Sequence, residues 1–230
     1  FHIRKGENIL AAVVRAGSRG WGFLCAKPRD PVVFREGKTW KPYRDSALEI
    51  IPGSALDLSA QNDAPAGKYG PAVLSPDGKA VFKHAPEQTV RLLGFNTYAL
   101  NGIMTIKDNG EFKAAVRRFA QAAKRQGYNL FRTQSFDRWL VLDSKQEYQL
   151  NSFYLDRTDF LIAELKKQGI YIHLPIFNFS LFSRERNTFR DRTLHKFMMY
   201  FDGEWEMEHF RFAVKSLLEH VNPYTGVAWK

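Results

Sequence analysis

The chain repeats one local plan three times: a short apolar run that ends in polar residues, followed by an amphipathic segment. The apolar runs occupy residues 90–96, 128–137 and 170–178. The amphipathic segments occupy residues 111–126, 155–168 and 204–221. Strands that alternate with helices at this spacing are typical of βαβ units, which build a parallel sheet. The sequence therefore predicts an α/β fold with three strand–helix units.

Glycines mark two of the junctions between these units. Gly127 and Gly169 each follow an amphipathic segment directly and precede an apolar run. A glycine just past a helix adopts the left-handed conformation that lets the chain leave the helix axis and enter the next element. Because both junctions have the same form, we interpret the segments as repeated βα units of a barrel.

Polar residues lie where the three predicted strands end. They are Asn96, Arg132, Gln134, Asp137 and Asn178. Parallel α/β sheets carry their binding and catalytic groups at the carboxyl ends of the strands. These five residues therefore form the predicted site.

Each of these residues has a functional and a structural interpretation. Arg132 can hold a catalytic carboxylate ionised and oriented through a bidentate contact, or it can form a structural ion pair at the barrel mouth. Asn96 and Asn178 can bind a sugar hydroxyl, but asparagine beside a turn more often satisfies loop backbone groups. His173 lies in the middle of the third run, which favours a buried structural histidine over a catalytic one.

Aromatic residues are frequent in the segments after the second and third strands. They are Trp139, Phe179, Phe182, Tyr200 and Trp205. Exposed rings at a barrel mouth are suited to stacking on sugars. Rings in loops also serve as ordinary hydrophobic packing, so both interpretations stay open.

The region before the first unit has a different character. Residues 1–26 alternate like antiparallel strands around the turn at 17–20, which indicates the last hairpin of a β-sandwich. Residues 27–53 contain four prolines and no sustained period, as in a linker. Residues 54–230 hold the barrel units, with a short hairpin predicted around the Pro-Asp-Gly turn at 76–78. Because residue 1 is Phe and the first segment resembles mid-domain sequence, we expect both ends to be cuts or processed ends.

The charge and composition of the chain bear on whether nucleic acid, a membrane, a metal or a cofactor is an expected partner. The net charge is +10, but the basic residues are scattered over predicted helix faces beside acids, so nucleic acid is not an expected partner. No apolar run approaches the roughly 20 residues of a membrane span. The lone Cys25 excludes an internal disulfide and a cysteine-built metal site. Since the sequence also lacks a phosphate-binding loop and a nucleophile elbow, no metal or cofactor is expected. The location stays open, with a secreted or periplasmic protein favoured.

Several short sequence segments resemble those of the cellulase-like (β/α)8 glycoside hydrolases, a group similar to glycoside hydrolase family 5. They are DAPAGKYG at 63–70, VRLLGFN at 90–96, GYNLFR at 127–132, LDRTD at 155–159, GIYI at 169–172 and HVNPYTG at 220–226. The resemblance covers about residues 54–230, and the last string is the most telling. KGEN at 5–8 and GWGF at 20–23 are similar to the closing hairpin of the sugar-binding-like β-sandwiches often attached to such enzymes.

The resemblance implies a retaining hydrolase with one carboxylate as acid/base and another as nucleophile, about 5–5.5 Å apart. In that superfamily the acid/base follows an Asn at the end of the fourth strand, and the nucleophile ends the seventh. Both are therefore expected beyond Lys230, and the chain alone is expected to be inactive. Arg132 matches the second-strand arginine that supports the nucleophile, while Asn178 stands where many relatives have a histidine or another polar group.

The resemblance also sets the expected partners and one rival. The partners are a carbohydrate substrate and the remainder of the chain's own barrel. The rival is a non-catalytic carbohydrate-binding barrel that retains the aromatic residues and lacks the two acids. The sugar and the linkage are not specified by the residues of this chain.

Overall fold

The computed structural model describes residues 49–97, 99–134, 139–140, 148–175, 194, 196–201 and 203–229. The chain divides into two units, Phe1–Ala47 and Leu48–Lys230, and all described residues lie in the second. The predicted β-sandwich hairpin (1–26) and most of the predicted linker (27–53) lie outside the described residues. Both stay predictions.

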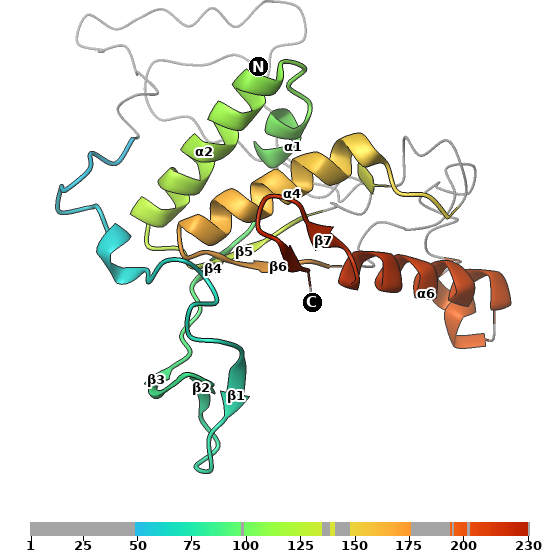
Figure 1. Ribbon diagram of the computed structural model, residues 1–230, viewed down its shortest axis with the longest axis horizontal. Coiled ribbons are helices and arrows are strands. Elements are labelled where there is room, and N and C mark those ends of the chain that lie inside the picture. The colour runs from blue at the N-terminus through green and yellow to red at the C-terminus, as the bar shows by residue number, and fades with distance from the viewer. Residues whose placement is uncertain are drawn as a thin grey trace, which may run out of the picture. The chain divides into compact units, whose positions relative to one another are not determined.

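Three short strands form a parallel sheet in the order β4–β5–β6. Their bounds are Gly94–Phe95 for β4, Leu130–Arg132 for β5 and Tyr171–His173 for β6. Helix α2 (Asn109–Arg125) lies between β4 and β5 in sequence, and α4 (Ser152–Lys167) lies between β5 and β6. The two helices pack against each other beside the sheet (Figure 1). The predicted α/β class and the βαβ plan are confirmed.

Local signals explain where the two long helices begin and end. The side chain of Asp108 accepts a hydrogen bond from the first turn of α2, and Asn151 caps α4 in the same way. Gly127 and Gly169 follow these helices with φ angles of 79° and 81°. Both glycines therefore act as predicted, since only a residue without a Cβ adopts this conformation at little cost.

The remaining helices are shorter or lie near the carboxyl end. They are η2 (Ser59–Gln61), α1 (Ala99–Met104), η4 (Met199–Phe201) and α6 (Glu204–Leu218). The helix predicted over 204–221 therefore ends three residues early. Val221 fits the helical stripe, but it begins β7 (Val221–Asn222), which pairs with β8 (Val227–Ala228) in a small antiparallel hairpin.

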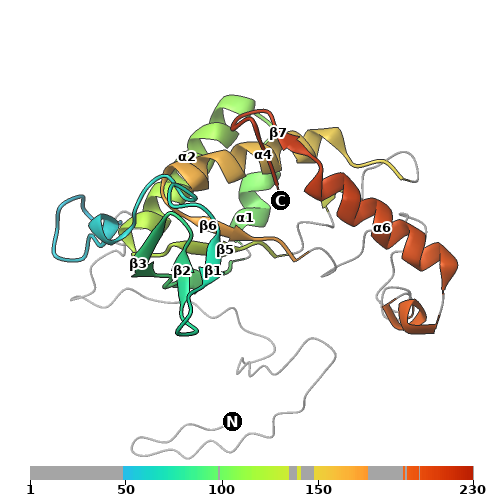
Figure 2. The ribbon, with the colours of Figure 1, turned by 60° about the horizontal axis from the view of Figure 1, so that its bottom comes forward.

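A second, antiparallel sheet has the order β1–β2–β3. Its strands are Ala72–Leu74, Ala80–Phe82 and Ala85–Thr89. The hairpin predicted around the Pro-Asp-Gly turn is confirmed as β1 and β2. The ring of Phe82 stacks on Tyr171 of β6, with centroids 6.1 Å apart, so the two sheets lie side by side (Figure 2).

The first parallel strand is shorter than predicted. The run at 90–96 was expected to be one strand, but β4 begins only at Gly94. Upstream of it, the backbone N–H of Val90 donates to the carbonyl of Ala80 at 2.8 Å and so prolongs the antiparallel sheet. Strand β3 has no counterpart among the predicted elements, because the sequence APEQT contains proline and shows no apolar alternation.

The main core lies between the parallel sheet and the helices. Its buried members come from α1, α2, β5, α4 and the residue just before β6: Leu100, Met104, Phe112, Val116, Ala120, Ala123, Phe131, Phe160, Leu161, Leu165 and Ile170. A smaller cluster joins Leu140 to Ala213 and Leu217 of α6. None of the described helices is both long and apolar enough to cross a bilayer.

Candidate functional site

The face of the parallel sheet opposite α2 and α4 carries polar side chains at the strand ends. We call it the open face, because no described helix covers these strand ends on that side. Phe131 is fully buried in the main core, and the register pairs Arg132 with His173. Because side chains alternate along a strand, Arg132 and His173 lie on the opposite face, away from α2 and α4. Asn96 follows Phe95, which packs on the core, and is exposed at the end of β4. The structure therefore brings Asn96, Arg132 and His173 to one edge of one face.

Backbone contacts connect the ends of β5 and β6. The N–H of Thr133 donates to the carbonyl of His173 at 3.1 Å, and its hydroxyl reaches the same oxygen at 3.4 Å. Thr133 itself is buried. The parallel pairing thus continues past Arg132. The backbone at Arg132 is therefore fixed on both sides, and so is the point from which its side chain extends.

Arg132 is half-buried, and no carboxylate in the described part of the chain is within ion-pair distance of it. The structural ion pair considered from the sequence is therefore not seen there. His173 differs from its prediction as a buried histidine, because its side chain is exposed on the open face. A guanidinium and an imidazole are both able to donate hydrogen bonds to anionic or hydroxyl-rich groups.

The other predicted site residues have different positions. Gln134 is half-buried just past the end of β5. Asp137 and Asn178 lie outside the described residues, as do Phe179 and Phe182. The structure therefore tests neither their role nor their distance from Arg132.

The two predicted tryptophans are packed within the protein. Trp139 contacts both hydrophobic clusters and stacks on Tyr154 with ring centroids 6.4 Å apart. Trp205 lies in the first turn of α6, with its ring 3.8 Å from that of the buried His209. Tyr200, by contrast, is 86% exposed. Of these three rings, Tyr200 is the one with most of its surface open for stacking.

A buried polar cluster that the sequence interpretation did not include lies beside the sheet. Asp159 on α4 is 1% exposed, and its carboxylate contacts His220 at 2.7 Å and the indole N–H of Trp229 at 2.9 Å. Burial raises the pKa of the Asp159 carboxyl, and the two hydrogen bonds oppose that effect. One feature of the sequence could have indicated this cluster. Asp159 ends the LDRTD segment at 155–159 and lies close to the apolar face of its helix.

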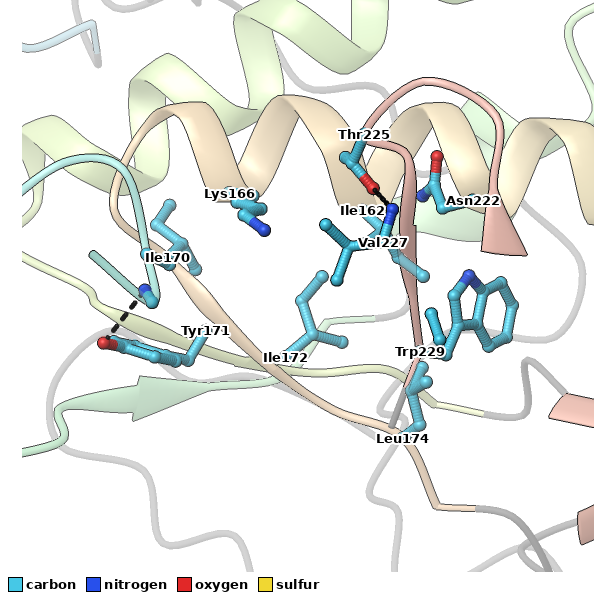
Figure 3. A pocket seen from close by; sticks show the side chains of 13 residues that line it. Ile162, Lys166, Ile170, Tyr171, Ile172, Leu174, Asn222, Thr225, Val227 and Trp229 are labelled. Carbon is cyan, nitrogen blue, oxygen red and sulfur yellow. Dashed lines mark hydrogen bonds between the residues drawn. The ribbon is translucent and has the colours of Figure 1, made fainter. Parts of the chain in front are cut away.

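A groove of about 230 Å³ runs along the outer edge of β6 (Figure 3). Its walls come from β6, α4 and the β7–β8 hairpin, and they are mainly apolar. The labelled side chains include Ile162, Ile172, Leu174, Val227 and Trp229. Among the described residues, β6 has no strand on this side, since the parallel sheet ends there.

No group of three or more His, Cys, Asp or Glu side chains in the described part of the chain is arranged to hold a metal ion. The chemistry that the open face offers is hydrogen bonding from asparagine and histidine together with the charge of Arg132.

Comparisons with known proteins give two sequence relatives in rice. Mannan endo-1,4-beta-mannosidase 3 of Oryza sativa subsp. japonica is 33% identical over 155 residues, which are 62% of this chain and 31% of the relative. Mannan endo-1,4-beta-mannosidase 4 of the same organism is 31% identical over 155 residues, covering 62% of this chain and 32% of the relative. The chain thus spans about a third of the length of the curated relatives it matches.

A comparison with solved structures gives two further matches. Two structures of a glycoside hydrolase family 5 mannosidase from Rhizomucor miehei have TM-scores of 0.48 and 0.47, with 12% identity over 69% of this chain and 45% of theirs. No protein-family model matches the sequence. The two rice relatives confirm that this chain resembles the cellulase-like glycoside hydrolases.

Proposed function

We propose that the whole protein is a retaining glycoside hydrolase that cleaves β-1,4-linked mannan. The observation that carries the proposal is the 33% identity to a mannan endo-1,4-beta-mannosidase over 155 residues. A retaining mechanism uses two carboxylates about 5–5.5 Å apart, one as acid/base and one as nucleophile. Both carboxylates belong to strands beyond Lys230, the fourth and the seventh.

The fold supports an incomplete barrel as the setting for this chemistry. The described βα units form one parallel sheet, with its helices on one face and polar residues at the strand ends on the other. A (β/α)8 barrel typically needs about 250 residues. A fourth parallel strand would cover the apolar groove along β6 and pair with the backbone groups at that edge.

The amino-terminal part completes the proposed domain arrangement. Residues 1–26 are the closing hairpin of a sugar-binding-like β-sandwich, and residues 27–53 link it to the barrel. An extracellular or periplasmic location agrees with a polysaccharide substrate, which is too large to reach an intracellular enzyme intact.

Arg132 is the residue of this chain that we place closest to the reaction. Its half-buried guanidinium lies at the carboxyl end of β5, opposite the helices. There it can hold the nucleophilic carboxylate ionised by a charge-assisted contact. Asn96 and His173, on the flanking strands, can bind hydroxyl groups of the sugar.

The test is hydrolysis of mannan by the whole protein, with cellulose and xylan as comparison polymers. We expect release of β-configured mannooligosaccharides, which retention requires. Substituting Arg132→Ala should lower kcat by about 100-fold or more, because a preorganised charge at the reacting groups is lost. Arg118→Ala, which removes an exposed arginine on α2, is the matched control and should leave kcat unchanged.

Two results would contradict parts of this proposal. Tight binding of mannan without hydrolysis would favour the rival, a non-catalytic carbohydrate-binding barrel. Wild-type turnover in the Arg132→Ala protein would remove Arg132 from the site while leaving the enzyme assignment intact.

A further inference from the structure

The carboxylate of Asp159 connects two parts of the chain that are far apart in sequence. Its Oδ2 lies 2.7 Å from Nε2 of His220, just before β7, and its Oδ1 accepts a hydrogen bond from the indole N–H of Trp229, just after β8, at 2.9 Å. The backbone carbonyl of the same residue accepts from the side chain of Asn222 at 2.9 Å. One residue of α4 therefore holds both ends of the β7–β8 hairpin.

The hairpin is also held together internally. The N–H of Trp229 donates to the carbonyl of His220 at 3.1 Å, and the two rings meet edge to face with centroids 5.2 Å apart. Asn222 is 1% exposed, and its side-chain oxygen accepts from the N–H of Tyr224 at 2.8 Å. The hairpin is thus held by its own hydrogen bonds, and the side chains of His220, Asn222 and Trp229 attach it to α4 through Asp159.

The attachment of the hairpin to Asp159 places Trp229 beside β6, the strand at the edge of the parallel sheet. Trp229 lines the groove along β6 together with Ile172 and Leu174 (Figure 3). Trp229 and Leu174 also pack against the same small hydrophobic cluster. The backbone at Trp229 therefore leaves the hairpin beside the strand edge that lacks a partner among the described residues.

We propose that Asp159 is a positioning residue, which locks the β7–β8 hairpin to α4 and so sets where the fourth strand begins along the edge of β6. The inference rests on the proposed function, in which that strand carries the general acid/base. Asp159 does not touch the substrate. It acts through Trp229 and His220 on the register of the strand that follows them.

A misplaced acid/base gives a specific kinetic signature. General acid catalysis matters most when the leaving group is a poor one, such as a sugar hydroxyl, and contributes about 10²–10⁴-fold. An activated dinitrophenyl leaving group departs with little help from an acid. Loss of positioning should therefore affect mannooligosaccharides far more than the dinitrophenyl glycoside of the same mannooligosaccharide.

The test uses three variants in the whole protein. Asp159→Leu removes both acceptors at similar volume, while Asp159→Asn keeps an oxygen for Trp229 and an amide group that can donate to the other tautomer of His220. Glu164→Leu is the matched control, since Glu164 is a buried acid of the same helix that pairs instead with Lys167 at 2.7 Å.

We expect Asp159→Leu to lower kcat/KM for mannooligosaccharides by about 100-fold, with a change of less than about 5-fold for the dinitrophenyl substrate. Asp159→Asn should restore most of the activity, and Glu164→Leu should leave the ratio between the two substrates as in the wild type. Equal losses on both substrates in Asp159→Leu would show a merely structural role and overturn the proposal.

Hydrogen exchange separates this inference from the proposed function. The amide of Trp229 should exchange faster in Asp159→Leu and at the wild-type rate in Glu164→Leu. If the wild-type protein hydrolyses neither substrate, the proposed function fails, and the exchange rate alone decides the positioning claim. Unchanged protection of the Trp229 amide in Asp159→Leu would overturn the claim that Asp159 positions the hairpin.

Discussion

The guanidinium of Arg157 donates a hydrogen bond to the backbone carbonyl of Met104 across 2.9 Å, in the interior between α4 and the end of α1. Arg157 is 2% exposed, and its charged group lies 4.2 Å from the ring centres of both Phe112 and Phe153. Burial lowers the pKa of this arginine. A buried cation is thus satisfied by one carbonyl and two aromatic faces, which ties α1, α2 and α4 together.

Replacing this arginine should destabilise the protein. In Arg157→Leu the carbonyl of Met104 loses its partner and the two rings lose the cation between them, so we expect the free energy of unfolding to fall by about 2 kcal/mol. Urea denaturation measures the change. Arg118→Leu, at an exposed position of α2, should stay within about 0.5 kcal/mol of the wild type. Equal stabilities of the two variants would contradict the proposed role of Arg157.

The parts of the fold that could be predicted are those with local causes. The helices α2 and α4 follow from a 3.6-residue apolar period, and their ends follow from Gly127 and Gly169. The carboxyl-end position of Arg132 follows from the strand that it closes. Each of these signals is contained within a few neighbouring residues.

Gly169 should be the least replaceable of the described glycines with positive φ. A Cβ at this position would collide with the backbone carbonyl of Asp63, in addition to the cost of a φ of 81°. We expect Gly169→Ala to destabilise the protein by more than about 2 kcal/mol, since the left-handed conformation alone costs roughly 1–2 kcal/mol. Gly53→Ala, with a φ of 75° and open space around it, is the control. Similar shifts of the urea midpoint for both variants would contradict the close-contact argument.

The parts that could not be predicted depend on contacts between distant segments. Val221 extends the apolar stripe of α6, but the anchoring of His220 and Asn222 to Asp159 draws the chain into a hairpin instead. In the same way, Trp139 has a loop-like sequence context, and only the folded structure brings it against Tyr154. Local periodicity carries no information about partners some tens of residues away, so tertiary contacts decide these positions.

Asn129 should contribute to the alignment of the first two parallel strands. Its side-chain oxygen accepts from the N–H of Leu93 at 2.7 Å, and its amide donates to the carbonyl of Arg91 at 2.8 Å. Asn129→Ala removes both bonds and should lower the free energy of unfolding by about 1–2 kcal/mol. Asn129→Asp should keep the first bond and set an oxygen against the carbonyl of Arg91. If both variants unfold at the wild-type urea concentration, the side chain does not stabilise the strand pair.

Tyr224 should lose its proton at a higher pH than an ordinary tyrosine. Burial, followed by the 2.8 Å hydrogen bond that its hydroxyl donates to Asp156, raises its pKa from 10.0 to about 12. Because the pKa is higher in the folded protein, the contribution of this tyrosine to stability is complete below pH 10.0 and is lost as the pH rises through about 12.

An alkaline titration followed by tyrosinate absorbance measures this pKa. In that titration Tyr224→Phe should remove one of the last transitions. Asp156→Asn should move that transition to lower pH, because the carboxylate that opposes the phenolate is gone. A titration curve that is identical in Asp156→Asn and the wild type would show that the hydrogen bond between the hairpin and α4 does not form in solution.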